Sequence, residues 1–116
     1  MSTGNQKYTT FYITKEVALV LDQISSITEI PKTRIINRAL RDFIGRRPQR
    51  IQPELLVTKK TDPRYIKRDY YMGCHMDPGI HAEVKRIAEE QHCTMAAVIM
   101  QALGDWETAM RYRGGQ

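Results

Sequence analysis

The sequence predicts a mainly helical fold with a two-stranded antiparallel ribbon, built from two strand–helix–helix repeats that pair into one pseudo-two-fold domain. Three observations lead to this prediction. Two segments share the same order of turn residues and apolar spacing, and they align without a gap. Each segment is also too short to bury a stable core alone. The total length of 116 residues suits one compact domain.

The first repeat, predicted over residues 7–45, begins with a strand and continues with two helices. The stretch YTTFYI, from Tyr8, is rich in the β-branched and aromatic residues typical of strands. Thr14 suits a helix N-cap, Pro31 interrupts the helical pattern, and Gly45 is expected at the end of the second helix. The positions expected to face inward are Val17, Leu21, Ile24 and Thr28, then Ile35, Ile36, Ala39, Leu40 and Phe43.

The second repeat, predicted over residues 70–112, has the same order of elements. The strand YYMGCHM, from Tyr70, precedes Asp77-Pro78, a helix start with a cap residue and proline at the first helical position. Thr94 is expected to cap the second helix. The inward positions are Ile80, Val84, Ile87 and Gln91, then Val98, Ile99, Ala102, Leu103 and Trp106.

An offset of 63 residues aligns the two repeats. Identities are few, but the apolar positions coincide, so that Leu40 falls on Leu103 and Phe43 on Trp106. The alternative is that the two segments are unrelated helical hairpins whose patterns coincide. The continuous register over the strand and both helices disfavours this alternative. Because a lone strand leaves its backbone donors and acceptors unpaired, each repeat needs a second one, and this chain supplies it.

The segment between the repeats, residues 46–69, is predicted to be a basic linker. It contains eight basic and three acidic residues. A flexible chain of this length spans ~25–30 Å on average, which allows the two strands of one chain to pair. Tethering favours this pairing over dimerisation, and a strand-swapped dimer of two chains is the alternative.

A strand, a helix, a short turn and a second helix within such a length resemble the ribbon-helix-helix superfamily of the Arc and MetJ repressors. The stretches TFYITKEVALVLDQI and EIPKTRIINRAL carry this resemblance, which covers residues 7–45 and 70–108. Two repeats in one chain are similar in architecture to relaxosome accessory proteins of conjugative plasmids, the TraY type. The resemblance implies sequence-specific binding of double-stranded DNA through the ribbon in the major groove. The role implied is that of a transcriptional repressor or an accessory factor in plasmid transfer.

The strand residues that face outward are the candidates for contact with DNA bases. Side chains alternate between the faces of a strand, so Phe11, Ile13, Cys74 and Met76 are expected to face the helices. The resemblance implies base contacts for the opposite face, whose residues are Tyr8, Thr10, Tyr12, Tyr71, Gly73 and His75. The alternative is an ordinary solvated strand face. Since the two strands differ in sequence, the DNA site is expected to be asymmetric.

Phosphate contacts are expected at the start of each second helix, where backbone amides and the helix dipole favour anions. The net charge is +2 over residues 7–44, +5 over the linker and −4 over residues 70–107. Because phosphate binding needs cations, repeat one and the linker are expected to provide most of it. The candidate phosphate-binding residues are Lys32, Thr33, Arg34, Thr94, Arg46 and Arg47. The further linker candidates are Arg50, Lys59, Lys60, Arg64, Lys67 and Arg68.

Several other functional classes are not expected. No apolar run is long enough for a membrane span, and the polar start lacks the apolar region of a secretory signal. Two cysteines without a close pair indicate reduced thiols and a cytoplasmic location. Cys74-His75 and His92-Cys93 have zinc-ligand side chains, but neighbours on a strand point to opposite faces, so neither a metal nor a cofactor is expected. No GxSxG or HExxH motif occurs, and no enzymatic activity is expected.

A protein-interaction module on the same fold is the second functional hypothesis, comparable to an antitoxin or a protein inhibitor with weak DNA binding. The acidic second repeat and Gly73 at an outward strand position favour it. The expected partners are therefore double-stranded DNA, further copies of the chain on adjacent sites, and a protein in the second hypothesis.

Overall fold

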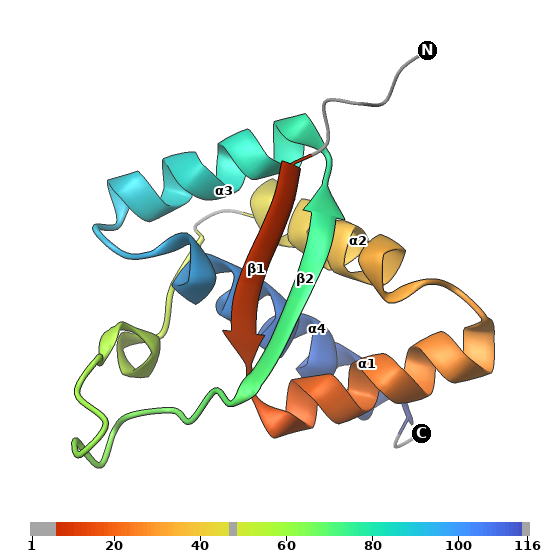
Figure 1. Ribbon diagram of the computed structural model, residues 1–116, viewed down its shortest axis with the longest axis horizontal. Coiled ribbons are helices and arrows are strands. Elements are labelled where there is room, and N and C mark those ends of the chain that lie inside the picture. Colours follow the sequence, from red (N-terminus) through yellow and green to blue (C-terminus); the bar gives the residue numbers. More distant parts are fainter. Residues whose placement is uncertain (1–6, 47–48, 115–116) are drawn as a thin grey trace.

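The order strand, helix, helix occurs twice along the chain (Figure 1). The structure is a computed structural model that describes residues 7–46 and 49–114, with side chains as far as residue 112. Its elements are β1 (Lys7–Ile13), α1 (Lys15–Thr28), α2 (Lys32–Gly45), the 3-10 helix η1 (Pro53–Leu56), β2 (Tyr70–Met76), α3 (Pro78–Glu90) and α4 (Met95–Gly114). The predicted class, mainly helical with one two-stranded antiparallel sheet, is confirmed. None of the described helices is long and apolar enough to cross a membrane.

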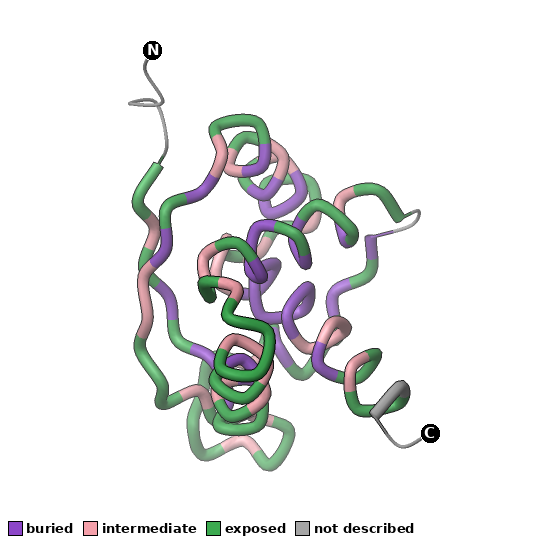
Figure 2. The backbone as a smooth tube through the Cα atoms, turned by 90° about the vertical axis from the view of Figure 1, so that its right-hand side faces the viewer, coloured by how far each residue is buried: buried purple, intermediate pink, exposed green. Residues whose placement is uncertain are grey.

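The two strands pair with each other although the linker and two helices separate them in the sequence. Lys7 lies opposite Met76, Ile13 lies opposite Tyr70, and Thr10 and Gly73 form the central pair. The strands form a layer of their own, and the helices lie on one side of it (Figure 2). The backbone groups of each strand therefore find hydrogen-bond partners in the other strand, and one face of the ribbon is left open.

The alternation predicted for the strands is confirmed. The side chains of Phe11, Ile13, Cys74 and Met76 are buried against the helices. Below them, α2 and α4 contribute the buried residues that the sequence predicted, and Trp106 is half-buried at the edge of this core. These buried helix residues are Ile35, Ile36, Ala39, Leu40, Phe43, Val98, Ile99, Ala102 and Leu103.

Two predicted N-caps are confirmed, and one residue predicted to face inward is exposed. The hydroxyls of Thr14 and Thr94 accept hydrogen bonds from the amides of Val17 (3.3 Å) and Ala97 (3.1 Å), as N-caps do. Thr28, which we expected to face inward, is exposed. It lies at the end of α1, where its hydroxyl donates to the Ile24 carbonyl (2.6 Å), so a polar role at the helix end overrides the apolar spacing.

Part of the linker, within residues 49–56, packs against the core. Ile51 and Leu55 are buried, and they pack in the same cluster as the helices. The amide of Gln52 donates to the side-chain oxygen of Gln101 in α4 (2.7 Å). Gln91, which was expected to face inward, is half-buried and donates to the Gln49 carbonyl. The linker is therefore held against α4 and α3 and does not act only as a tether.

Asn37 connects the middle of α2 to the end of β2. Its side chain is 8% exposed. The side-chain amide donates to the carbonyl of His75 (2.9 Å), and its oxygen accepts from the amide of Asp77 (3.2 Å). Asn37 thus pairs two backbone groups at the point where β2 becomes α3, which fixes the backbone of His75.

Replacing Asn37 by alanine should destabilise the fold by about 1–3 kcal/mol, because the variant removes the part-buried hydrogen bonds to the His75 carbonyl and from the Asp77 amide. Urea unfolding measures this change as a lower midpoint. Arg38→Ala is the matched control, since Arg38 follows on the same helix and is exposed, and its effect should stay within about 0.5 kcal/mol. Equal midpoints for the two variants would contradict the role given to Asn37.

Candidate nucleic-acid interface

The open face of the ribbon carries three cross-strand pairs. Tyr8 lies opposite His75, Thr10 opposite Gly73, and Tyr12 opposite Tyr71. We call these six residues the ribbon face. They are the six residues predicted to contact bases, and the structure brings all of them to one surface. Tyr8 is 63% exposed, Tyr12 52% and Tyr71 61%, so this surface is accessible.

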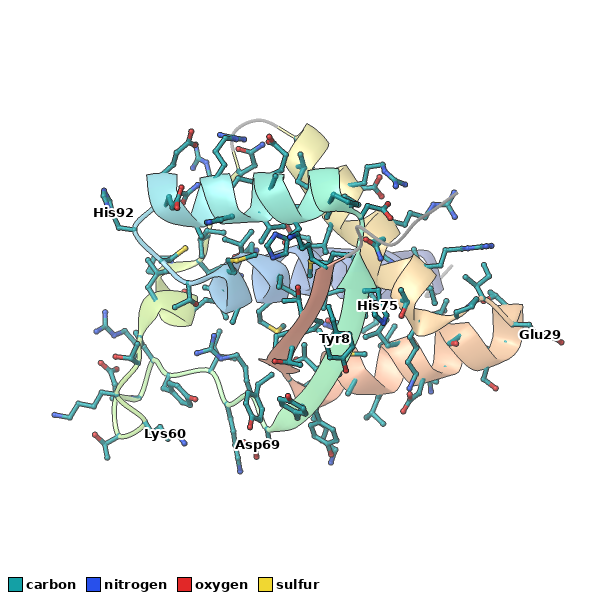
Figure 3. All side chains as sticks on the ribbon, turned by 45° about the horizontal axis from the view of Figure 1, so that its top comes forward. Tyr8, Glu29, Lys60, Asp69, His75 and His92 are labelled. Atoms are coloured by element: carbon teal, nitrogen blue, oxygen red, sulfur yellow. The ribbon has the colours of Figure 1, made fainter. Side chains whose placement is uncertain are left out.

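Aromatic rings flank the centre of the ribbon face on both sides. The rings of Tyr8 and His75 have centroids 4.9 Å apart (Figure 3), and those of Tyr12 and Tyr71 are 5.1 Å apart. Both pairs are tilted, an arrangement that aromatic rings prefer to a face-to-face sandwich. These contacts restrict the side chains of the ribbon face before any ligand binds.

Gly73 provides the space into which Tyr8 leans. A Cβ atom at position 73 would lie 2.6 Å from Cζ of Tyr8 and even closer to its hydroxyl oxygen. No side chain could therefore occupy position 73 while Tyr8 holds this orientation. A glycine inside a strand often marks such a close approach, and this was the signal in the sequence for the contact.

The start of α2 combines open amides with several cations. The first hydrogen bond of this helix runs from the amide of Arg34 to the Pro31 carbonyl (3.0 Å), and no side chain caps the helix. The amides of Lys32 and Thr33 precede it and so have no partner within the helix. Lys32 forms an ion pair with Asp22 of α1, and both side chains are largely exposed.

Two arginines that the sequence analysis did not select lie beside this helix start. Arg38 and Arg41 line one cleft together with Arg34 and Thr33, which we call the α2 cleft. Their spacing of four and seven residues from Arg34 places them on one helix face, a signal present in the sequence. Arg41 pairs with Asp77 (3.2 Å), whereas Arg34 and Arg38 form no ion pair within the described part of the chain.

The start of α4 differs from that of α2 in charge. The hydroxyl of Thr94 serves as the helix cap. Met95 and Ala96 follow, so this helix start offers no cationic side chain of its own. The starts of α2 and α4 therefore differ in charge, in the direction that the sequence predicted.

Arg46, a predicted phosphate-binding residue, does not lie at the ribbon face. The guanidinium of Arg46 pairs with Asp105 of α4 (3.3 Å) and lies 5.5 Å from the ring centre of Phe43. This is the end of α2 opposite to Lys32, at a distance of ~20 Å along a helix of this length. Arg47 lies outside the residues that the structure describes.

No metal site forms within the described residues from the four possible zinc ligands Cys74, His75, His92 and Cys93. No group of three or more histidine, cysteine, aspartate or glutamate side chains there could hold a metal ion. Cys74 is buried while His75, its neighbour, is exposed on the opposite face. Burial raises the pKa of the Cys74 thiol to about 11, which disfavours the thiolate that a metal needs.

Comparisons with protein-family models, with curated proteins and with solved structures find no match to this chain.

Replacing Gly73 by alanine should move Tyr8 away from His75. The new Cβ would overlap the Tyr8 ring, and the ring can rotate into solvent, so we expect the fold to persist with stability changed by less than about 1 kcal/mol. The ring-current shifts of the His75 protons in NMR spectra measure the displacement.

Gly79→Ala is the matched control, because a Cβ at Gly79 meets no atom within 4 Å. This variant should leave the His75 signals unchanged. Unchanged His75 signals in Gly73→Ala would show that Tyr8 does not lean over Gly73 in solution.

Proposed function

We propose that this chain is a cytoplasmic, sequence-specific double-stranded DNA-binding protein whose ribbon face enters the major groove. One observation supports the proposal most. Six outward side chains lie as three opposed pairs on an exposed two-stranded ribbon. The major groove is wide enough to admit such a ribbon. A transcriptional repressor and an accessory factor in plasmid transfer both need this activity, and these are the roles we propose.

The proposal includes two equivalent repeats related by a pseudo-two-fold axis. The central pair, Thr10 and Gly73, supports this because the two residues are separated by the same 63 positions that align the repeats. An axis through this pair exchanges Tyr8 with Tyr71 and Tyr12 with His75. The contact between Tyr8 and His75 then corresponds to the contact between Tyr71 and Tyr12, and both occur at similar distances.

The ribbon face has the chemistry that base contacts require. Hydroxyls of tyrosine and threonine donate and accept hydrogen bonds, and so do the ring nitrogens of His75. The methyl group of Thr10 suits contact with a thymine methyl. Because the paired side chains differ between the strands, the preferred site should not be a palindrome.

The α2 cleft would anchor the DNA backbone beside the ribbon. Phosphate contacts fix the position of a protein on DNA, and base contacts determine sequence preference. The guanidinium groups of Arg34 and Arg38 suit phosphate because they form no ion pair within the described residues. Lys32 would exchange Asp22 for a phosphate, which costs little for an exposed pair.

Selection of duplexes from a random pool at physiological salt tests the proposal, since weak electrostatic binding is screened there. We expect enrichment of one asymmetric motif. If no motif is enriched, sequence-specific binding is wrong, and capture of a tight protein partner would then support the interaction module that the acidic second repeat favours.

Variants of the ribbon face and of the α2 cleft should affect binding differently. Thr10→Ala combined with Tyr12→Ala should reduce discrimination between the selected and a scrambled duplex by about 10-fold or more, since each base contact contributes about 1–3 kcal/mol. Arg34→Ala should weaken both duplexes equally and lower the salt slope by about 1. Titrations at several salt concentrations measure both effects.

Thr108→Ala is the control, because Thr108 is exposed on α4 and does not belong to the ribbon face. It should leave affinity and discrimination unchanged. Equal loss of discrimination in the ribbon and Arg34 variants would contradict the division between base contact and backbone anchoring.

A further inference from the structure

The second half of the linker forms a cleft with the ribbon. From the ribbon, Tyr12 and Tyr71 line this cleft, and Thr94 lines it at the start of α4. From the linker come Lys60, Arg68 and Asp69. Figure 3 shows Asp69 at the start of β2 and Lys60 on the adjoining linker loop. We call this the linker cleft. It is continuous with the ribbon face through the two tyrosines.

The linker cleft is positively charged. Neither Lys60 nor Arg68 forms an ion pair within the part of the chain that the structure describes, and Arg68 lies 5.5 Å from the ring centre of Tyr65. The carboxylate of Asp69, which also lines the cleft, is paired with Lys67 (3.3 Å). The two cations are therefore available to an anion, and the acid beside them is compensated.

Consecutive turns order the linker around these cations. The amide of Asp62 donates to the Lys59 carbonyl (3.0 Å), and the amide of Tyr65 donates to the Asp62 carbonyl (2.9 Å). Hydrogen bonds from Arg64 hold the pKa of Asp62 below its usual value. Ile66 packs against the core. Such an ordered segment loses less conformational entropy on binding than a mobile loop would.

The linker cleft lies where the second repeat lacks cations. In the α2 cleft, Arg34, Arg38 and Arg41 come from the helix itself. The residues 63 positions further along, which belong to α4, are Ala97, Gln101 and Gly104. At the corresponding helix start the positive groups that line the cleft come from the linker instead.

We propose that the linker cleft binds a phosphate of the DNA backbone through Lys60 and Arg68, and so replaces the anchor that α4 lacks. This inference rests on the proposed function. The ligand is a phosphodiester of a bound duplex and not a free phosphate, because the cleft is continuous with the ribbon face. A duplex whose major groove holds the ribbon brings its backbone alongside it. Arginine and lysine are the side chains that bind phosphate best.

The test compares the wild-type chain with the double variant Lys60→Ala, Arg68→Ala on the selected duplex. Each phosphate contact contributes about 0.9 to the slope of log affinity against log salt, so the slope should decrease by about 2. Sequence preference should be unchanged. Hydroxyl-radical footprinting should show protection lost on one flank of the asymmetric site only, and inorganic phosphate at millimolar concentration should not compete.

The matched control is Arg50→Ala with Lys59→Ala, which removes two charges from the same linker. Both were phosphate candidates in the sequence, but neither lines the linker cleft, and Arg50 lies beside Phe43 and Arg46 instead. Its slope should stay within about 0.5 of the wild type, and its footprint should be complete. An unchanged slope in the Lys60, Arg68 variant, equal effects of both double variants, or competition by inorganic phosphate would each overturn the linker anchor while leaving duplex binding intact. Absence of any duplex binding by the wild type would overturn both proposals.

Discussion

The antiparallel pairing of β1 with β2 is the constraint on which the rest of the structure depends. Each strand alone would leave a row of backbone donors and acceptors without partners, and each helical pair alone would leave its apolar side uncovered. The pairing brings both halves of the chain together, so that α2 and α4 share one core below the ribbon. The same pairing leaves one ribbon face open, and this is the face that we propose for DNA.

The two halves share a framework but differ in polar detail. Asn37 fixes the backbone of His75, whereas the residue 63 positions further along is the buried Met100. Tyr8 leans over Gly73, whereas the corresponding position in β1 is occupied by Thr10 and not by a glycine. The cations beside the ribbon come from α2 on one side and from the linker on the other. The apolar spacing is thus similar in the two halves, while the groups that we propose to contact DNA differ.

Local periodicity explains how much of this could be predicted from the sequence. Alternation in the strands determined which of their residues face outward, and helical spacing determined the buried apolar positions of α2. In α4 it determined only half of the buried positions, because Ala97, Met100, Gln101 and Glu107 are buried as well. Thr28 was placed wrongly because apolar spacing cannot show that a hydroxyl is used at a helix end. The contacts of Asn37, Tyr8 and Arg46 join residues far apart in the chain, so their partners become known only when the elements are assembled.

The most direct test of the central claim is NMR mapping of the amide signals during titration with a selected duplex. The account predicts that the largest shifts occur in β1 and β2 around the ribbon face and at the start of α2. The signals in the middle of α3, away from the ribbon, should move little. Largest shifts on α3 or on the end of α1, with the ribbon unaffected, would contradict a ribbon in the major groove.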